Sequence, residues 1–304
     1  MKDRLKFEKR SYKAHKDWLL SQFPTYLQQL ERLNFLIGRE TTQSYNYWIR
    51  SVGYKFLNPF LKTNHSWLTI GDCYGTDAEY LARTNSNVVA SDISDTFLAI
   101  AKEIGFIKEY ARQNAEKMDY EDNSFDYVLC NDTFHHFPRP YIALYEMLRV
   151  ARKAVILKEP IDPLSRMPLL LFACNVLDRK NPLKSGKIWK NRFSFEPVGN
   201  YVFKVSPREI EKIAMAANLP YIAYYYYNLP YDESLSEERM DHKSRKFARY
   251  LLRLRLRNFL CKLHLIPYSF VCPVLFKEEP TPELLNEMDS FGYSCLKLPK
   301  NPYI

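Results

Sequence analysis

The chain lacks paired cysteines of the kind that bind zinc or exchange disulfides. Its six cysteines stand at irregular spacing, and no C-x-x-C pair occurs. This absence argues against a zinc ribbon and a thioredoxin-like redox motif. Unpaired thiols at such spacing are typical of proteins in a reducing compartment. The sequence therefore predicts no metal site and favours the cytoplasm.

Glycine is scarce, and long apolar runs are missing. The chain has only 8 Gly but 23 Tyr and 19 Phe, which argues against disorder and low complexity. The most apolar run, residues 167–174, is far too short to span a membrane. The charged N-terminus has no apolar region of a secretory signal behind it. With 46% hydrophobic residues the chain can bury a sizeable core, so we expect a soluble cytoplasmic protein.

Acidic residues are absent from one long stretch of the sequence, whereas the rest of the chain contains both acidic and basic residues. Residues 242–277 contain nine Lys or Arg and no Asp or Glu, so this stretch carries the whole net charge of +9. Such a local patch indicates a local anionic partner, either an anionic membrane surface or an anionic substrate. Peripheral binding at the inner membrane face is therefore one expectation, and we expect no nucleic-acid partner.

The basic amphipathic segment, residues 239–265, reads best as a helix. One stripe of that helix would hold Phe247, Leu251 and Leu254. An adjoining stripe would hold four further apolar side chains, Leu252, Leu256, Phe259 and Leu263. A helix of this kind either covers the core with a solvated basic face or lies on an anionic membrane, and we favour the first. The run L-R-L-R-L-R also fits a strand.

The sequence divides into two regions that differ in their pattern of apolar residues. Residues 1–66 read as a helical N-terminal extension, with one helix over 19–38 that ends at Gly38. Residues 67–304 read as the main domain. Within it, residues 161–205 are rich in Pro, Lys and aromatics and lack clear alternation, so we interpret them as a cap or insertion.

Short apolar strands alternate with helical stretches in the main domain. We expect strands at 67–70, 88–92, 125–132 and 154–160, with helices between them. This alternation predicts an α/β fold, a Rossmann-like doubly wound and mostly parallel sheet with helices on both faces. Late strands are expected at 222–228 and 269–277, where alternation would bury two of the residues Tyr224 to Tyr227 and expose two.

Polar residues and glycines follow the expected strands where each one ends. A glycine turn, G-D-C-Y-G (71–75), follows the first strand, and Asp92 closes the second. Q-N-A-E (113–116) and N-D-T-F-H-H-F (131–137) come later. A glycine turn before a helix lets a ligand approach free N–H groups, and a carboxylate can bind both hydroxyls of a ribose. The strand ends therefore predict one ligand site.

These segments resemble the class I S-adenosylmethionine (SAM)-dependent methyltransferases, in particular their small-molecule branch. The resemblance covers residues 67–160, and D-N-S-F-D-Y-V with H-H-F after it is its most specific part. It implies SAM as cofactor, with the glycine turn at the methionine end and Asp92 on the ribose. The cofactor-binding residues that it implies are Gly71, Asp72, Gly75, Asp92, Ile93, Asn114, Ala115, Glu116 and Asn131.

The sequence departs from the family pattern at three positions. Thr69 stands where the family usually has an acid, Cys73 replaces a glycine, and Asn114 replaces a common Asp. Asp72 could take over from the missing acid if its side chain points inward.

The expected reaction is methyl transfer to a hydroxyl, which needs a base near the sulfonium. His135 or His136, with Asp132, is the candidate base. The family resemblance suggests a small-molecule acceptor or a sugar hydroxyl of a polysaccharide precursor. Three other interpretations stay open: an RNA methyltransferase that uses residues 242–277, a nicotinamide oxidoreductase, and a non-catalytic protein with a degenerate cofactor loop.

Overall fold

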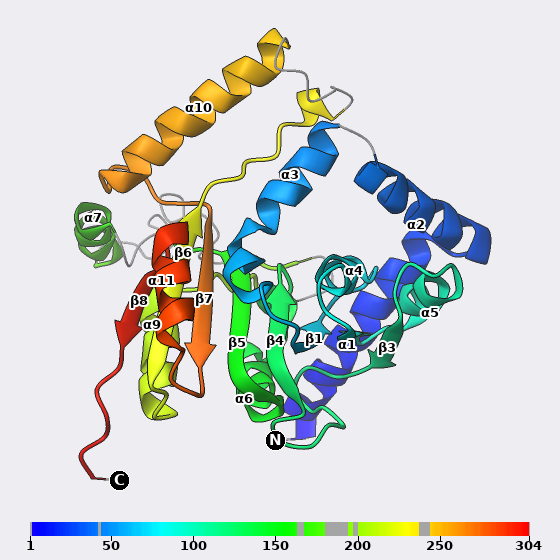
Figure 1. The fold of residues 1–304 in the computed structure, drawn as a ribbon, viewed down its shortest axis with the longest axis horizontal. Helices are drawn as coiled ribbons and strands as arrows, with labels where there is room; N and C mark the ends of the chain where they lie inside the picture. The colour runs from blue at the N-terminus through cyan, green and yellow to red at the C-terminus, as the bar shows by residue number, and fades with distance from the viewer. Residues whose placement is uncertain are drawn as a thin grey trace.

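The computed structural model describes residues 2–41, 44–162, 167–179, 194–196, 200–236 and 244–303, and Figure 1 shows how they are arranged. Eight strands form one sheet: β1 (Ser66–Ile70), β2 (Asn87–Asp92), β3 (Glu109–Arg112), β4 (Phe125–Asn131), β5 (Ala151–Pro160), β6 (Tyr221–Tyr227), β7 (Phe270–Phe276) and β8 (Ser294–Lys297). Their order is β3-β2-β1-β4-β5-β7-β6-β8.

The sheet has a parallel half and an antiparallel half. β1 pairs in parallel with β2 and β4, and the parallel pairing extends to β3 on one side and β5 on the other. β7 runs antiparallel to both β5 and β6, and β8 runs antiparallel to β6. The doubly wound, mostly parallel α/β fold is therefore confirmed, and the first polar residues after β1, β2 and β4 lie at one edge.

Helices cover both faces of the sheet. Their bounds are α1 (Lys2–Gln22), α2 (Tyr26–Thr41), α3 (Tyr45–Gly53), η1 (Lys55–Phe60), α4 (Thr76–Ala82), α5 (Thr96–Glu103), η2 (Phe134–His136), α6 (Pro140–Val150), α7 (Pro168–Asp178), α9 (Pro207–Ala216), η4 (Glu233–Leu235), α10 (Arg245–Lys262) and α11 (Pro282–Phe291). One core cluster joins the sheet to η1, α4, α5 and α11, and a second joins the opposite face to α6 and α9.

The helix expected over 19–38 is two helices. α1 ends at Gln22 and α2 begins at Tyr26, because Pro24 between them has no N–H to continue the ladder. Thr25 then accepts a hydrogen bond from the backbone N–H of Gln28 at 3.3 Å, which caps the new helix. Gly38 lies inside α2, so the expected end at this residue is wrong.

The four consecutive tyrosines of β6 do not divide into two buried and two exposed side chains. Tyr224 and Tyr227 are buried, and Tyr225 and Tyr226 are half-buried. They do alternate between faces: Tyr225 and Tyr227 pack in one core cluster, Tyr224 and Tyr226 in the other. The expected exposure is wrong because helices cover both faces of this interior strand.

The basic segment is a helix, α10, and the strand alternative is wrong. Residues 237–243, which include its expected beginning, lie outside the described residues. Part of the expected cap, residues 163–166, 180–193 and 197–199, lies outside them as well, and α7 is its longest described part. No helix in the described ranges is long and apolar enough to cross a membrane.

Candidate active site

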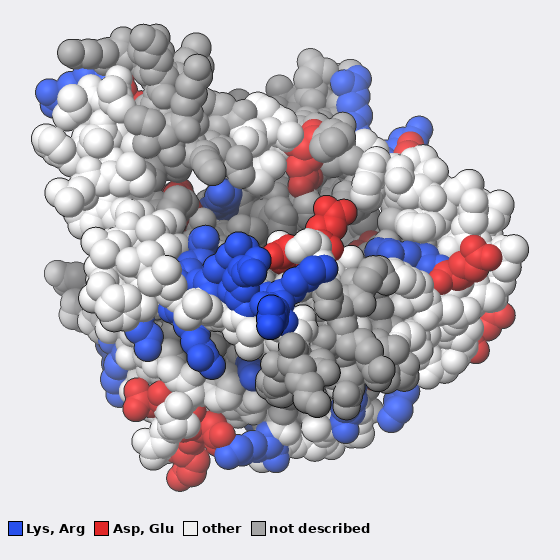
Figure 2. All heavy atoms as spheres, turned by 90° about the horizontal axis from the view of Figure 1, so that it is seen from above, with Lys and Arg blue, Asp and Glu red and all other residues white. Residues whose placement is uncertain are grey.

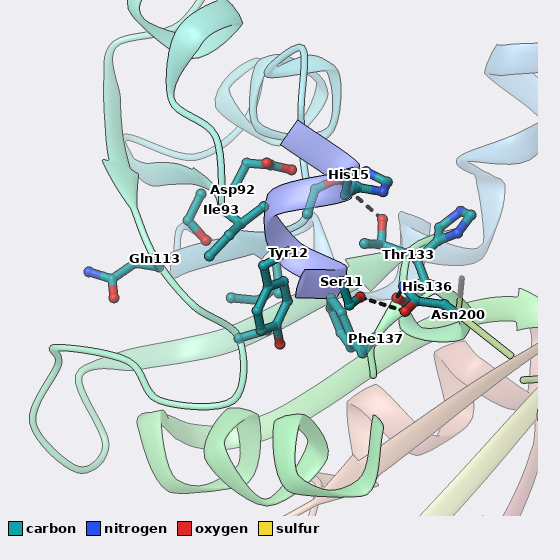
Figure 3. A pocket seen from close by; sticks show the side chains of 14 residues that line it. Ser11, Tyr12, His15, Asp92, Ile93, Gln113, Thr133, His136, Phe137 and Asn200 are labelled. Carbon is teal, nitrogen blue, oxygen red and sulfur yellow. Dashed lines mark hydrogen bonds between the residues drawn. The ribbon is translucent and has the colours of Figure 1, made fainter. Parts of the chain in front are cut away.

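A cavity opens where β1, β2 and β4 end, and Figure 3 shows its lining. It contains about 480 Å³ of empty space, counting its open part. The lining residues are Ser11, Tyr12, His15, Ile70, Gly71, Ser91, Asp92, Ile93, Gln113, Ala115, Thr133, His136, Phe137 and Asn200. Five of the expected site residues therefore meet here: Gly71, Asp92, Ile93, Ala115 and His136.

The glycine turn after β1 has the backbone geometry that only glycine adopts easily. Gly71 and Gly75 have φ of 71° and 74°. A side chain at Gly71 would collide with Thr133, whose hydroxyl donates to the Gly71 carbonyl at 3.2 Å. A side chain at Gly75 would come within 2.8 Å of Ile107. Both glycines are therefore required, although only Gly71 lines the cavity.

Asp72 points away from the cavity and caps α4. Its carboxylate accepts hydrogen bonds from the backbone of Ala78 at 2.8 Å and of Asp77 at 3.2 Å. It also accepts from the Thr69 hydroxyl at 3.0 Å, so Thr69 supports this acid. Burial and the nearby charge of Asp77 raise the pKa of Asp72 to about 7. The geometry of Asp72 therefore favours capping of α4 over the direct contact with the cofactor that was expected from the sequence.

A second buried carboxylate, that of Asp77, was not expected from the sequence. It accepts hydrogen bonds from the Tyr54 hydroxyl at 2.5 Å and from the Asn131 amide at 2.8 Å. Burial raises its pKa. Among the described residues, the buried Oδ1 of Asn131 has no hydrogen-bond partner. Asn131 is thus held in place by Asp77 while one acceptor stays available beside the end of β4.

Asp92 closes β2 and faces the cavity, as Figure 3 shows. One carboxylate oxygen accepts from the backbone N–H of Ser94 at 2.8 Å. The residue is 8% exposed, and burial raises its pKa to about 6. Asp92 is therefore a buried acid that a ligand in the cavity can reach.

The segment after β3 contributes differently from the expectation. Gln113 and Ala115 line the cavity, and Gln113 was named in the sequence only as part of a motif. The Asn114 side chain accepts from the backbone N–H of Glu116 at 2.9 Å. Glu116 itself is buried and accepts from the backbone and the guanidinium of Arg139 at 2.9 and 2.6 Å. Asn114 and Glu116 therefore shape this loop and do not line the cavity.

His135 and Asp132 stand just outside the cavity lining. The Nδ1 atom of His135 lies 2.6 Å from a carboxylate oxygen of the fully buried Glu159. Burial alone would lower the pKa of His135, but the hydrogen bond and charge of Glu159 outweigh it and raise that pKa. Asp132 forms an ion pair with Lys158. Glu159 was missed by sequence reasoning, because only the pairing of β4 with β5 brings it to the histidine.

His136 is the histidine that faces the cavity. Burial, followed by the neighbouring charge of His135, lowers its pKa to about 3. His136 is therefore neutral in neutral solution. One ring nitrogen of each histidine and a carboxylate oxygen of Glu196 lie within 4.8 Å of one another, a set that could hold a metal ion.

The cavity has a wall that the sequence did not reveal. α1 supplies Ser11, Tyr12 and His15, and the ring of His15 lies 5.9 Å from that of His136. Asn200 bridges the two sides, because it accepts from the Ser11 hydroxyl at 2.5 Å and donates to the His136 carbonyl at 2.6 Å. Figure 3 shows these side chains converging. No motif could reveal this wall, since its parts are far apart in sequence.

Comparisons with solved structures found several similar chains. The YcgJ protein from Bacillus subtilis is 19% identical over 75% of this chain and 100% of that chain, with a TM-score of 0.47. A SAM-dependent methyltransferase from Archaeoglobus fulgidus is 13% identical over 80% and 99%, with a TM-score of 0.47. Magnesium protoporphyrin IX methyltransferase from Synechocystis, with bound SAH, is 15% identical over 84% and 88%, with a TM-score of 0.42.

No curated protein matches the chain. Residues 68–157 match the family model described as a methyltransferase domain. This range starts inside β1 and ends inside β5, so it contains the glycine turn, Asp92 and the histidine pair. Residues 68–157 thus contain a methyltransferase domain, and its methyl donor is S-adenosylmethionine.

Proposed function

We propose that the protein transfers the methyl group of SAM to a hydroxyl of a small-molecule or saccharide acceptor. The observation that carries this proposal is the convergence of Gly71, Asp92, Thr133 and His136 on one cavity. When bound, SAM supplies a methyl group on a sulfonium. The protein then has to hold both reactants in line, keep out water and accept one proton.

The residues of the cavity fit SAM on chemical grounds. Gly71 leaves space where any side chain would collide with Thr133. Asp92 offers a buried carboxylate to the two ribose hydroxyls, and Ala115 offers an apolar surface for the adenine. Asn131 is a further proposed contact for the ammonium of the methionine part, because its buried Oδ1 has no hydrogen-bond partner within the described structure.

His136 is the proposed proton acceptor. It lines the cavity, and a base must lie within hydrogen-bond reach of the proton that it accepts. Its pKa of about 3 leaves the ring unprotonated but makes it a weak base, which suffices for the strongly acidic proton of the oxonium that forms as the methyl group is transferred. His135, fixed by Glu159 at 2.6 Å, holds the turn that carries His136. Asp132 is assigned to its ion pair with Lys158 rather than to proton transfer.

Isothermal calorimetry with SAM and with its demethylated product tests the cofactor site. We expect both to bind the native chain. Asp92→Ala should weaken SAM binding by about 100-fold, because a buried hydrogen-bonding partner is lost. Asp119→Ala is the matched control, since Asp119 is exposed and lies outside the cavity lining. Absence of binding at millimolar SAM would instead favour a non-catalytic protein.

A labelled-methyl screen over sugars, nucleotide-linked and lipid-linked saccharides and RNA would identify the acceptor. We expect transfer to a hydroxyl compound. Transfer to RNA, with binding that falls steeply as salt rises, would overturn the small-molecule proposal.

We place the reaction in the cytoplasm, because the six cysteines are free among the described residues.

A further inference from the structure

α10 presents two apolar stripes on opposite sides. The inner stripe contains Phe247, Tyr250 and Cys261, which are 2%, 4% and 1% exposed. It packs against α3, where Trp48 meets the rings of Phe247 and Tyr250 at 5.3 and 5.8 Å. Coverage of the core, the interpretation favoured from the sequence, therefore describes this stripe.

The outer stripe faces solvent along its whole length. It consists of Leu252, Leu256, Phe259 and Leu263, with exposed fractions of 66%, 58%, 57% and 52%. Their steps of four, three and four residues keep them within about 60° around the axis at roughly 100° per residue. The same rotation places them about opposite Phe247 and Tyr250. The two stripes are thus opposed, not adjoining as the sequence suggested.

Positive charges border the outer stripe on both sides. By the same rotation, Arg249 and Arg253 lie on one flank, and Arg255 and Lys262 lie on the other. All four are exposed. Figure 2, seen from above, shows a cluster of Lys and Arg side chains on this side of the molecule, with Asp and Glu side chains next to it. Among the described residues of the loop before α10, the acids Asp232 and Glu233 line a hollow beside the helix.

α7 adds further exposed apolar surface next to α10. Leu169, Phe172 and Val176 are 87%, 70% and 44% exposed, and α7 carries no Lys or Arg. Met167, which precedes α7, lines the same small cavity as Cys261 at the end of α10. Figure 1 shows α7 beside that end of α10. The two helices therefore offer apolar side chains from neighbouring places.

We propose that α7 and the outer face of α10 form an interfacial surface that binds an anionic lipid bilayer. An apolar stripe between rows of Arg and Lys suits such a surface: the apolar side chains enter the acyl boundary, and the cations meet lipid phosphates. A nucleic acid would use the cations but leave the exposed Leu and Phe side chains in water. Charge and apolar pattern together therefore select lipid.

The surface lies at the same edge of the sheet as the cofactor cavity. Asn228, just after β6, donates to Asn258 at 2.8 Å and accepts from Arg257 at 3.0 Å, which ties α10 to the end of β6. Phe270 of β7 pairs with the last residues of both β5 and β6, so these two strands end at the same edge. A docked molecule would thus turn its cofactor edge toward the bilayer. This orientation rests on the proposed function and favours a lipid-linked acceptor, whereas lipid binding itself does not depend on catalysis.

Co-sedimentation with vesicles tests the proposal. The full chain should bind vesicles of phosphatidylcholine with 30% phosphatidylglycerol (about one lipid in three) much more tightly than vesicles of phosphatidylcholine alone, and added salt should weaken this binding. Arg249→Gln/Arg253→Gln/Arg255→Gln should weaken it by about 100-fold, at roughly fivefold for each charge that is lost. Leu252→Gln/Leu256→Gln/Phe259→Gln should weaken it by at least about tenfold.

Leu27→Gln/Leu296→Gln is the matched control, because both side chains are exposed apolar residues on other elements. It should bind vesicles like the native chain. All variants should bind SAM normally, which separates this proposal from the proposed function and shows that they fold. Equal binding to both vesicle types would overturn the proposal, and so would binding to RNA alone. A chain that binds no vesicles and forms a dimer that Leu256→Gln dissociates would overturn it as well.

Discussion

The cofactor cavity and the outer face of α10 lie near the same edge of the sheet. Both depart from the usual pattern of buried apolar and exposed polar side chains, but in opposite ways. The cavity buries polar groups, such as Asp92 at 8% exposure, whereas the helix exposes apolar ones, such as Leu256 at 58%. Buried polar groups and exposed apolar patches are the informative exceptions in a globular protein. The cofactor cavity and the proposed lipid-binding surface therefore consist of different residues. A substitution in one of them should leave the function of the other intact.

His136→Ala should have the largest effect, on the cavity side of this comparison. We expect kcat to fall by about 1000-fold, because the side chain that faces the acceptor would be lost. Single-turnover methyl transfer is the measurement, with His264→Asn, in the turn after α10, as a control that should keep full activity. Because His136 is already neutral, with a pKa of about 3, its own titration should leave the rate unchanged between pH 8 and 5.

Retained turnover in His136→Ala would remove His136 as the base. A similar loss in His135→Gln with an unchanged pH profile would indicate a positioning role for His135, as its bond to Glu159 implies.

A pair of phenylalanines in α10 sharpens the comparison within one helix. Phe247→Ala should lower the free energy of unfolding by about 3 kcal/mol, since its ring is buried against α3. Phe259→Ala should change it by less than about 0.5 kcal/mol, because its ring is 57% exposed. Urea unfolding of both variants measures the difference. Similar losses for both would mean that the outer stripe is covered in solution.

Asp72 should make stability depend on pH. Its pKa is about 7 in the folded state and 3.8 as its ordinary value, so the folded state holds a proton that the unfolded state releases. Stability from this group is therefore present below pH 4 and is lost as pH rises to about 7. Urea unfolding at pH 5 and pH 8 should show a loss of about 2 kcal/mol that Asp72→Asn removes.

Asp289→Asn, at an exposed position of α11, is the control for this slope. If the native chain and Asp72→Asn share one pH dependence, the buried carboxylate is not the cause.

Sequence reasoning reached the parts of the site that depend on local pattern. The glycine turn and Asp92 could be found because a strand, a turn and a helix are encoded in neighbouring residues. Strand β3, at 109–112, was not assigned because its four residues, E-Y-A-R, show no apolar run. Helix α11 and strand β8 were missed too, although Thr281, Pro282 and Gly292 carry start and stop signals.

The remaining parts of the site depend on contacts between distant residues. Glu159 reaches His135 only through the pairing of two strands, and Tyr54 reaches Asp77 from the turn between α3 and η1. The direction of the Asp72 side chain also could not be predicted. It follows from the free N–H groups at the start of α4, which compete with any ligand for the carboxylate.

The bridge through Asn200 sets the order in which the cavity can be completed during synthesis. Ser11 and Asn200 are 189 residues apart, yet they share a hydrogen bond across the cavity. The helix that carries Ser11 leaves the ribosome long before its partner exists, and contacts of such separation form late. The nascent chain should therefore be unable to close around its methyl donor until about two-thirds of it has been made, as Asn200 stands at position 200 of 304.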